Sequence, residues 1–151
     1  KSTQVKSASQ AEADYMRTHN NTRPLEATVV TYTTESSATR MQRGGAPARI
    51  TSIIELVDGS KEPVRDAREE LNVYMPDGRL AKTHSKPIQI SGAGRYNNTF
   101  DYAMPENTPQ GVYKASTSLY VNNRITQSRS INTQVVLDGN NKPILVLASS
   151  S

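Results

Sequence analysis

The sequence contains no cysteine and no tryptophan, and it has only one phenylalanine. The lack of cysteine excludes disulfide bonds, thiolate zinc sites and cysteine nucleophiles. No apolar run approaches the roughly 18 residues that a membrane-spanning helix requires. The fold therefore has to rest on a hydrophobic core without covalent cross-links, and we expect no membrane span.

Catalytic signatures are also missing. The two histidines, His19 and His84, lie in different sequence contexts, and neither has a carboxylate or a second histidine at metal-ligand spacing. The chain has no G-x-S-x-G elbow, no H-E-x-x-H motif and no glycine-rich phosphate loop. Two carboxylates that converge in space only would escape such a search. We expect a non-enzymatic protein that uses no cofactor and no metal.

Acidic residues gather between positions 62 and 70, where they alternate with Lys61, Arg65 and Arg68. The acidic residues are Glu62, Asp66, Glu69 and Glu70. Because the cations neutralise them and the spacing is not that of a calcium loop, we predict a solvated, ion-paired surface here. The same stretch could form a helical turn or a loop.

The most informative stretch runs from Tyr102 to Leu137. Apolar and polar residues alternate with period 2 over 113–121 and again over 131–137, which predicts two half-buried strands. Asn122-Asn123 lies between them, and asparagine adopts positive φ at modest cost. The pattern predicts a tight hairpin.

The approach to this hairpin resembles a known family. Pro109-Gln110-Gly111-Val112-Tyr113, followed by a long alternating strand, is similar to the penultimate strand of bacterial immunoglobulin-like and fibronectin-III-like sandwich domains. The resemblance covers, in layout, roughly the last two-thirds of the chain, and it implies that Tyr113 helps to fix the start of the strand. The immunoglobulin cysteine pair and tryptophan are absent, which excludes the antibody-like branch.

The rest of the chain supports a sandwich of β-strands as well. Further strands are predicted at 25–34, 49–57, 71–75, 80–90, 96–104 and 144–147. In the first of these, alternation places Val29 and Thr31 on one face and Val30 and Tyr32 on the other. Phe100 is the natural core anchor. We predict an all-β, immunoglobulin-like antiparallel sandwich over residues 25–151.

Residues 1–24 form a polar leader or arm. Ser9-Gln10-Ala11-Glu12 has the spacing of a capping box, so a short helix can follow. Its apolar face is too small to anchor it firmly. The segment is either a flexible leader or an arm that packs on, or adds a strand to, a neighbouring subunit.

Basic residues supply the candidate partner contacts. They are Arg40, Arg43 and Arg49 in a long loop, and Lys82, His84 and Lys86 on one face of a predicted strand. The second group is either a strip for carboxylate or phosphate, or an edge whose lysines prevent pairing with other sheets. Although the net charge is +4, no block of five basic residues occurs, which argues against nucleic acid as the partner.

These observations favour a structural or protein-interaction module of a secreted, periplasmic or cell-surface system, with a protein partner or self-association. A serine-, threonine- and asparagine-rich, cysteine-free β-domain suits that setting. One alternative is a carbohydrate-binding module that uses tyrosines such as Tyr74, Tyr96, Tyr102 and Tyr120. The other is a subunit of a surface fibre or capsid.

Overall fold

The computed structural model describes residues 2–36, 42–43, 47–88, 92–103, 109–137, 139–140 and 143–150. The elements are β1 (Ser2–Lys6), α1 (Ala8–Thr18), β2 (Thr28–Ser36), β3 (Gln42–Arg43), β4 (Pro47–Val57), β5 (Ala67–Tyr74), β6 (Leu80–Pro87), β7 (Gly94–Ala103), β8 (Gly111–Val121), β9 (Arg124–Leu137) and β10 (Pro143–Ser150).

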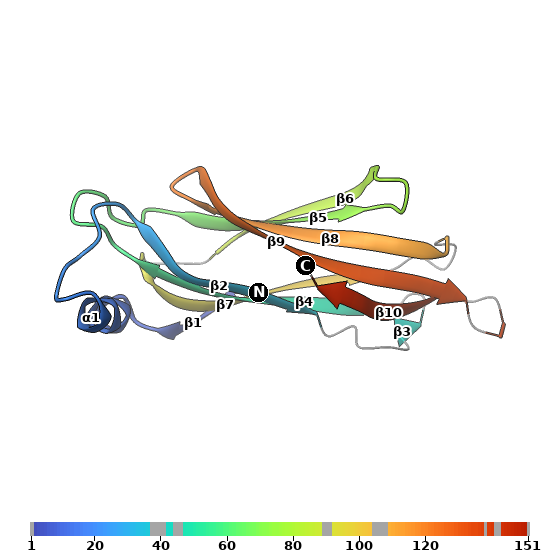
Figure 1. Ribbon diagram of the computed structural model, residues 1–151, viewed down its shortest axis with the longest axis horizontal. Helices are drawn as coiled ribbons and strands as arrows, with labels where there is room; N and C mark the ends of the chain where they lie inside the picture. Colours follow the sequence, from blue (N-terminus) through green and yellow to red (C-terminus); the bar gives the residue numbers. More distant parts are fainter. Residues whose placement is uncertain are drawn as a thin grey trace.

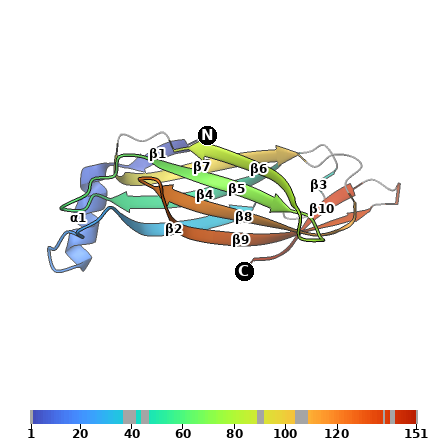
Figure 2. The same ribbon diagram turned by 90° about the horizontal axis from the view of Figure 1, so that it is seen from above.

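The strands form two antiparallel sheets. One has the order β1-β7-β4-β2 and the other β3-β10-β9-β8-β5-β6. The sheets stack as the two layers of an elongated sandwich, with α1 at one end and β3 and β10 toward the other (Figures 1 and 2). The predicted class, an antiparallel β-sandwich, is confirmed.

Among the residues that the structure describes, two apolar clusters form the core between the inner faces of the sheets. The smaller one consists of Ile50, Leu71, Phe100 and Ala115 with Val73 packed against it. The larger one contains Tyr32, Ile54, Leu56, Val64, Ala67, Ile88, Ala93, Tyr96, Leu119 and Val121. Phe100 is 3% exposed, so its predicted place in the core is confirmed.

A buried polar layer separates these clusters. Ser52, Glu69, Asn98 and Thr117 each occupy the inward position between the apolar residues of β4, β5, β7 and β8, and each is at most 1% exposed. The Glu69 carboxylate accepts hydrogen bonds from Tyr32 Oη (2.6 Å), from Ser52 Oγ and from Asn98 Nδ2 (2.8 Å). One carboxylate of the six-stranded sheet thus joins three strands of the opposite sheet.

Glu69 corrects the prediction of a solvated surface over residues 62–70. β5 begins at Ala67, four residues before the predicted strand, and its burial alternates so that Ala67, Glu69 and Leu71 face the core. A glutamate at an inward position hides this alternation in the sequence. Burial is tolerated because the carboxylate is hydrogen-bonded inside the core.

The hairpin between β8 and β9 forms where it was predicted. Asn122 and Asn123 have φ of 49° and 66°, the pair of positive values that a two-residue type I′ turn needs. At the start of β8, Tyr113 Oη donates a hydrogen bond to the carbonyl of Pro109 at 2.9 Å. This bond fixes the entrance to the strand.

β2 differs from strict alternation. The pairing with β4 shifts register between Val29 and Thr31, so Val30 is the extra residue of a β-bulge. As a result Val29 and Tyr32 both pack on the core, whereas Val30 is 41% exposed. The prediction that Val30 and Tyr32 share a face was therefore wrong.

β2 is an edge strand, and a side chain of β9 covers part of its free hydrogen-bonding edge. Arg129 Nε donates to the main-chain carbonyl of Tyr32 at 3.1 Å, and the guanidinium stands 5.4 Å from the centre of the Tyr32 ring. A main-chain acceptor at the edge of the sheet is thereby satisfied, which protects the edge from pairing with another strand.

The N-terminal segment adds a strand to the chain's own sheet. β1 pairs with the edge of β7, and Gln4 Nε2 donates to Tyr96 Oη at 3.2 Å. α1 begins at Ala8 because Ser7 Oγ accepts from the main-chain N–H of Gln10 at 3.2 Å. The capping serine is thus Ser7 and not Ser9, since Ser7 and Gln10 have the same capping spacing.

Ion pairs fasten α1 to the four-stranded sheet. Lys6 Nζ contacts Asp14 at 2.8 Å and Glu55 at 2.9 Å, and Arg95 contacts Glu55 at 2.9 Å. Ala11 is the buried residue of the helix, and it is fully covered. The helix is thus held by ion pairs together with the small apolar side chains of Ala11 and of Ala8, which packs against the core.

Candidate binding surface at the helix end of the sandwich

In the described part of the fold, the arginines that were predicted to contact a partner do not form one group. Arg40 lies outside the described residues. Arg43 belongs to β3 in the six-stranded sheet, and Arg49 belongs to β4 in the other. Arg49 Nε contacts Asp101 Oδ1 on the neighbouring strand β7 at 2.8 Å. Their role as partner contacts stays a prediction.

The second basic group lies on β6, which is the edge strand of its sheet, as predicted. The register places Lys82 opposite Val73, His84 opposite Leu71 and Lys86 opposite Glu69. His84 is half-buried, and the side chains of the two lysines lie outside the described part. No observation identifies a ligand for this strip.

The four tyrosines considered for sugar stacking do not form a common platform among the described side chains. Tyr96 is fully buried and donates to the carbonyl of Gly92 at 2.8 Å, so its proposed place on a sugar-binding surface was wrong. Tyr120 is half-buried under the guanidinium of Arg68, which lies 4.1 Å from the ring centre. Tyr74 is half-buried on β5, and the side chain of Tyr102 lies outside the described part.

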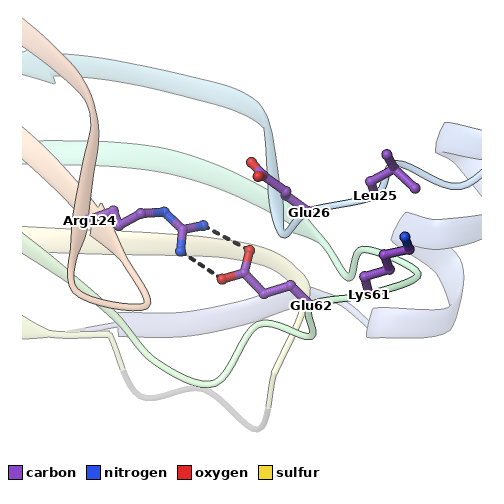
Figure 3. A pocket seen from close by; sticks show the side chains of 5 residues that line it. All are labelled: Leu25, Glu26, Lys61, Glu62 and Arg124. Carbon is purple, nitrogen blue, oxygen red and sulfur yellow. Dashed lines mark hydrogen bonds and ion pairs between the residues drawn. The ribbon is translucent and has the colours of Figure 1, made fainter.

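Three segments that are distant in sequence meet at the α1 end of the sandwich: residues 24–27 before β2, the loop 58–66 between β4 and β5, and the β8–β9 hairpin (Figures 1 and 3). Asn122 of the hairpin holds the loop with its side chain. Its Oδ1 accepts from the N–H groups of Arg65 (2.8 Å) and Asp66 (3.2 Å), and its Nδ2 donates to the Pro63 carbonyl at 2.9 Å. The hairpin and the loop are one connected unit.

The same loop is bonded to the segment that precedes β2. Ser60 N–H donates to the Pro24 carbonyl at 2.7 Å, and Lys61 N–H donates to the Leu25 carbonyl at 3.0 Å. The two backbones approach so closely at Gly59 that an added Cβ would stand 2.3 Å from the Leu25 oxygen. Only glycine fits there.

Glu62 is the centre of this surface. Arg124 Nη1 and Nη2 donate to its two oxygens at 2.7 and 2.8 Å (Figure 3). The Ala27 N–H donates to Oε1 at 3.1 Å. The hydrogen bonds from Arg124 lower the pKa of Glu62 to about 2. Both partners are therefore charged at neutral pH, and the paired geometry holds Arg124 in place.

A pocket of about 410 Å³ opens between these segments, lined by Leu25, Glu26, Lys61, Glu62 and Arg124. We call these five residues the tip surface. Leu25 is 62% exposed. Within the described part of the chain, the side chains of Glu26 and Lys61 make no hydrogen bond and no ion pair. The pocket thus offers one apolar wall, one neutralised ion pair and two charges of opposite sign.

Sequence reasoning missed the tip surface because its members come from three segments. The sequence places Leu25 in the predicted strand 25–34 and the charged residues near 62 in a predicted solvated surface, and no pattern marks Arg124. The available signal was the alternation of acidic and basic residues over 61–70, which correctly predicted ion pairing for Glu62. That Arg124 is the main partner of Glu62 follows from the fold, which brings the hairpin to the loop.

The described residues contain no group of three or more histidine, cysteine, aspartate or glutamate side chains that could hold a metal ion. Their helix is neither long nor apolar enough to cross a membrane.

Among known proteins, the likeness to solved structures is partial and distant. No protein-family model and no curated protein matches the chain. A Bacteroides uniformis β-glucuronidase structure is similar over 72% of this chain and 14% of that one, with TM-score 0.49 and 18% identity. B. uniformis β-glucuronidase 2, covalently bound to cyclophellitol-6-carboxylate aziridine, is similar over 74% and 15%, with TM-score 0.46 and 20% identity. The chain spans about a seventh of these proteins, and the likeness carries no argument about activity.

Proposed function

We propose that this chain is a non-enzymatic protein-interaction module of a secreted, periplasmic or cell-surface system, and that it binds through the tip surface. The observation that carries the proposal is the construction of that surface. Backbone and side-chain hydrogen bonds hold its three segments together, while Leu25, Glu26 and Lys61 stay available at its rim. A preorganised surface binds without the cost of ordering its own loops.

The arrangement of strands supports an immunoglobulin-like or fibronectin-III-like type for this module. β2, β4 and β7 share one layer, and β5, β8 and β9 share the other, as strands A, B, E and C, F, G do in such sandwiches. Tyr113 bonded to the Pro109 carbonyl has the geometry of a tyrosine corner. In this assignment the tip surface includes the B–C and F–G loops, and loops at one end of a sandwich are frequent recognition sites.

A site-specific cross-linking experiment tests the proposal. A photo-reactive amino acid is placed at position 25 and, as a matched control, at position 114, because Lys114 is exposed on the outer face of β8. After irradiation in the source cells, we expect a discrete protein adduct from position 25 and none from position 114. If both positions give the same adducts, or neither gives any, the tip surface is not a protein-binding site.

A further inference from the structure

We propose that two copies of this chain exchange their N-terminal arms, so that β1 of one copy pairs with β7 of the other. The arm comprises residues 2–18, which form β1 and α1, and the exposed segment 19–23 is its hinge. The arm docks on residues of its own chain, so a second copy offers the same contacts. This inference goes beyond the proposed function, because it concerns the edge of β7 and not the tip surface.

The arm has only a small share in the hydrophobic core. β1 is polar, and Val5, which lies where its register shifts, is 52% exposed. Among the described residues of the arm, Ala11 is the buried apolar one, and Ala8 packs against the larger core cluster. Because burial of apolar surface supplies most of the energy that anchors an element, the arm can detach while the sandwich stays folded.

The edge of β7 is nevertheless specific for β1. Gly94 admits the β1 backbone, since an added Cβ would stand 2.6 Å from the Lys6 carbonyl oxygen. Gln4 Nε2 donates to Tyr96 Oη at 3.2 Å, and Lys6 Nζ contacts Glu55 at 2.9 Å. A β7 edge without its strand would be an open template, and β1 of a second copy matches every one of these contacts.

The hinge has a strained backbone. Asn20 and Asn21 have φ of 56° and 55°, and two consecutive non-glycine residues in the left-handed region are unfavourable even for asparagine. The hinge ends at Pro24, whose carbonyl accepts from the Ser60 N–H at 2.7 Å. If the hinge extends and carries the arm to a second copy, the strain of both residues is released while the contacts of the arm are kept.

Arm exchange would also change how the tip surface is presented. The hinge ends beside Leu25, so an exchanged dimer carries two tip surfaces in one assembly. Two linked binding surfaces hold a repeated partner more tightly than one surface does. This consequence alone rests on the proposed function.

Engineered disulfides test the exchange, because the chain has no cysteine of its own. Thr3 and Asn97 lie directly opposite each other on β1 and β7, within the Cα separation that a disulfide needs. The variant Thr3→Cys/Asn97→Cys is refolded at about 1 mM, where mass action favours dimers, and is separated by size exclusion, oxidised and run on a non-reducing gel. We expect the cross-link to lie within one chain in the monomer fraction and between two chains in the dimer fraction.

A second cysteine pair is the matched control. Lys114 and Asn132 lie opposite each other on β8 and β9, which both belong to the body of the sandwich. Lys114→Cys/Asn132→Cys should therefore cross-link within one chain in both fractions. A pair that joined two chains here as well would indicate contact between whole molecules and not exchange of the arm.

Substitutions in the hinge test its strain. Asn20→Val/Asn21→Val should raise the ratio of dimer to monomer by about tenfold or more, because β-branched residues disfavour positive φ. Asn20→Gly/Asn21→Gly should lower that ratio, since glycine adopts the closed conformation without strain. Asn123→Val introduces the same strain at φ of 66° outside the hinge, so it should leave the ratio unchanged.

The outcomes distinguish this inference from the proposed function. A dimer that is cross-linked between chains through the arm pair alone, and that varies with the hinge as expected, supports the exchange. The absence of a dimer in both the wild type and the valine variant, an arm pair cross-linked within each chain of the dimer, or equal ratios in all hinge variants overturns it. If the exchange fails while cross-linking from position 25 still captures a different protein, the proposed function stands.

Discussion

At the scale of single residues, Glu69 is the most consequential side chain of the described core. A carboxylate removed from water is costly, and three hydrogen bonds from the opposite sheet offset that cost. Burial, together with the charge of Glu69, raises the pKa of Tyr32 well above its ordinary value, so Tyr32 stays a donor to the carboxylate throughout the physiological range. The polar layer favours one alignment of the sheets, because a shift of either would leave these groups unpaired.

Replacing Glu69 by alanine should therefore cost more than the loss of one contact. The substitution leaves the buried donors of Tyr32, Ser52 and Asn98 without their acceptor, and each orphaned group costs roughly 1–3 kcal/mol. We expect the free energy of unfolding in urea to fall by about 3 kcal/mol or more. Glu70→Ala, on the opposite face of the same strand, is the control and should change it by less than about 0.5 kcal/mol. Equal effects of the two substitutions would contradict the role of the polar layer.

At the scale of elements, the β8–β9 hairpin is hydrogen-bonded to the loop 58–66 that connects β4 and β5. Asn122 combines a positive φ, which the turn needs, with three side-chain hydrogen bonds to the loop 58–66. Asn123 shares the positive φ, but its side-chain Oδ1 accepts a single hydrogen bond, from Arg68 Nη1 at 3.2 Å. The two neighbours therefore differ in what a substitution should cost.

Substitutions in the turn distinguish the effect of its positive φ values from the effect of its hydrogen bonds to the loop 58–66. Asn122→Ala should lower the free energy of unfolding by about 2 kcal/mol, because it strains the turn and removes the bonds to the loop. Asn123→Gly should be nearly neutral, since glycine adopts the same φ without strain. Chemical denaturation measures both. An Asn122→Ala variant as stable as Asn123→Gly would show that the loop is held by other contacts.

The contact of β1 with β7 depends on a glycine. Gly94 has φ of 137°, and an added Cβ would stand 2.6 Å from the Lys6 carbonyl and from Gln4 Nε2. Gly94→Ala should therefore displace β1 and speed hydrogen exchange in residues 2–6 by about tenfold or more, with smaller changes in β8 and β9. Gly139→Ala, where nothing lies within 4 Å of the added Cβ, is the control. Unchanged exchange in residues 2–6 would contradict the close packing.

The sequence predicted those elements in which apolar residues occupy most of the inward positions. The hairpin, the Phe100 strand and the sandwich class follow from alternation and from asparagine at the turn. The start of β5 could not be predicted in this way, because Glu69 breaks the pattern at a buried position. β1 is short and polar, and it becomes a strand through its pairing with β7. The tip surface joins three segments whose contacts no local pattern encodes.

At the scale of the whole molecule, the net charge of +4 says little about the surface. Many basic side chains of the described part are engaged in ion pairs with carboxylates, including those of Lys6, Arg49, Arg79, Arg95 and Arg124. Several pairs join segments that are far apart in sequence, and the pair of Lys6 with Glu55 couples the N-terminal strand β1 to β4. Such pairs contribute most when they hold a defined geometry, as Arg124 and Glu62 do.

These pairs make the fold sensitive to acid. Lys6 and Arg17 lower the pKa of Asp14 to about 2, and Arg124 lowers that of Glu62 to about 2. A depressed folded-state pKa adds stability that is complete above the unfolded value, near 4, and that is lost as the pH falls toward 2. We expect the Tm to be nearly constant between pH 8 and about 5 and to fall below about pH 4.5.

Arg124→Gln tests which pair is responsible. Without the guanidinium, which is the largest cause of the lowered pKa of Glu62, that pKa moves back toward its ordinary range. The difference between its folded and unfolded values shrinks, and so does its share of the pH dependence. The variant should have a lower Tm than the wild type at pH 7 and a shallower fall between pH 4.5 and 2.5, as followed by thermal melts in circular dichroism. Arg79→Gln, whose partner Asp77 lies in the same turn, should change the Tm at pH 7 less. Parallel acid profiles for Arg124→Gln and the wild type would mean that the Glu62–Arg124 pair adds no pH-dependent stability, and that the tip is held by its backbone hydrogen bonds and by Asn122 alone.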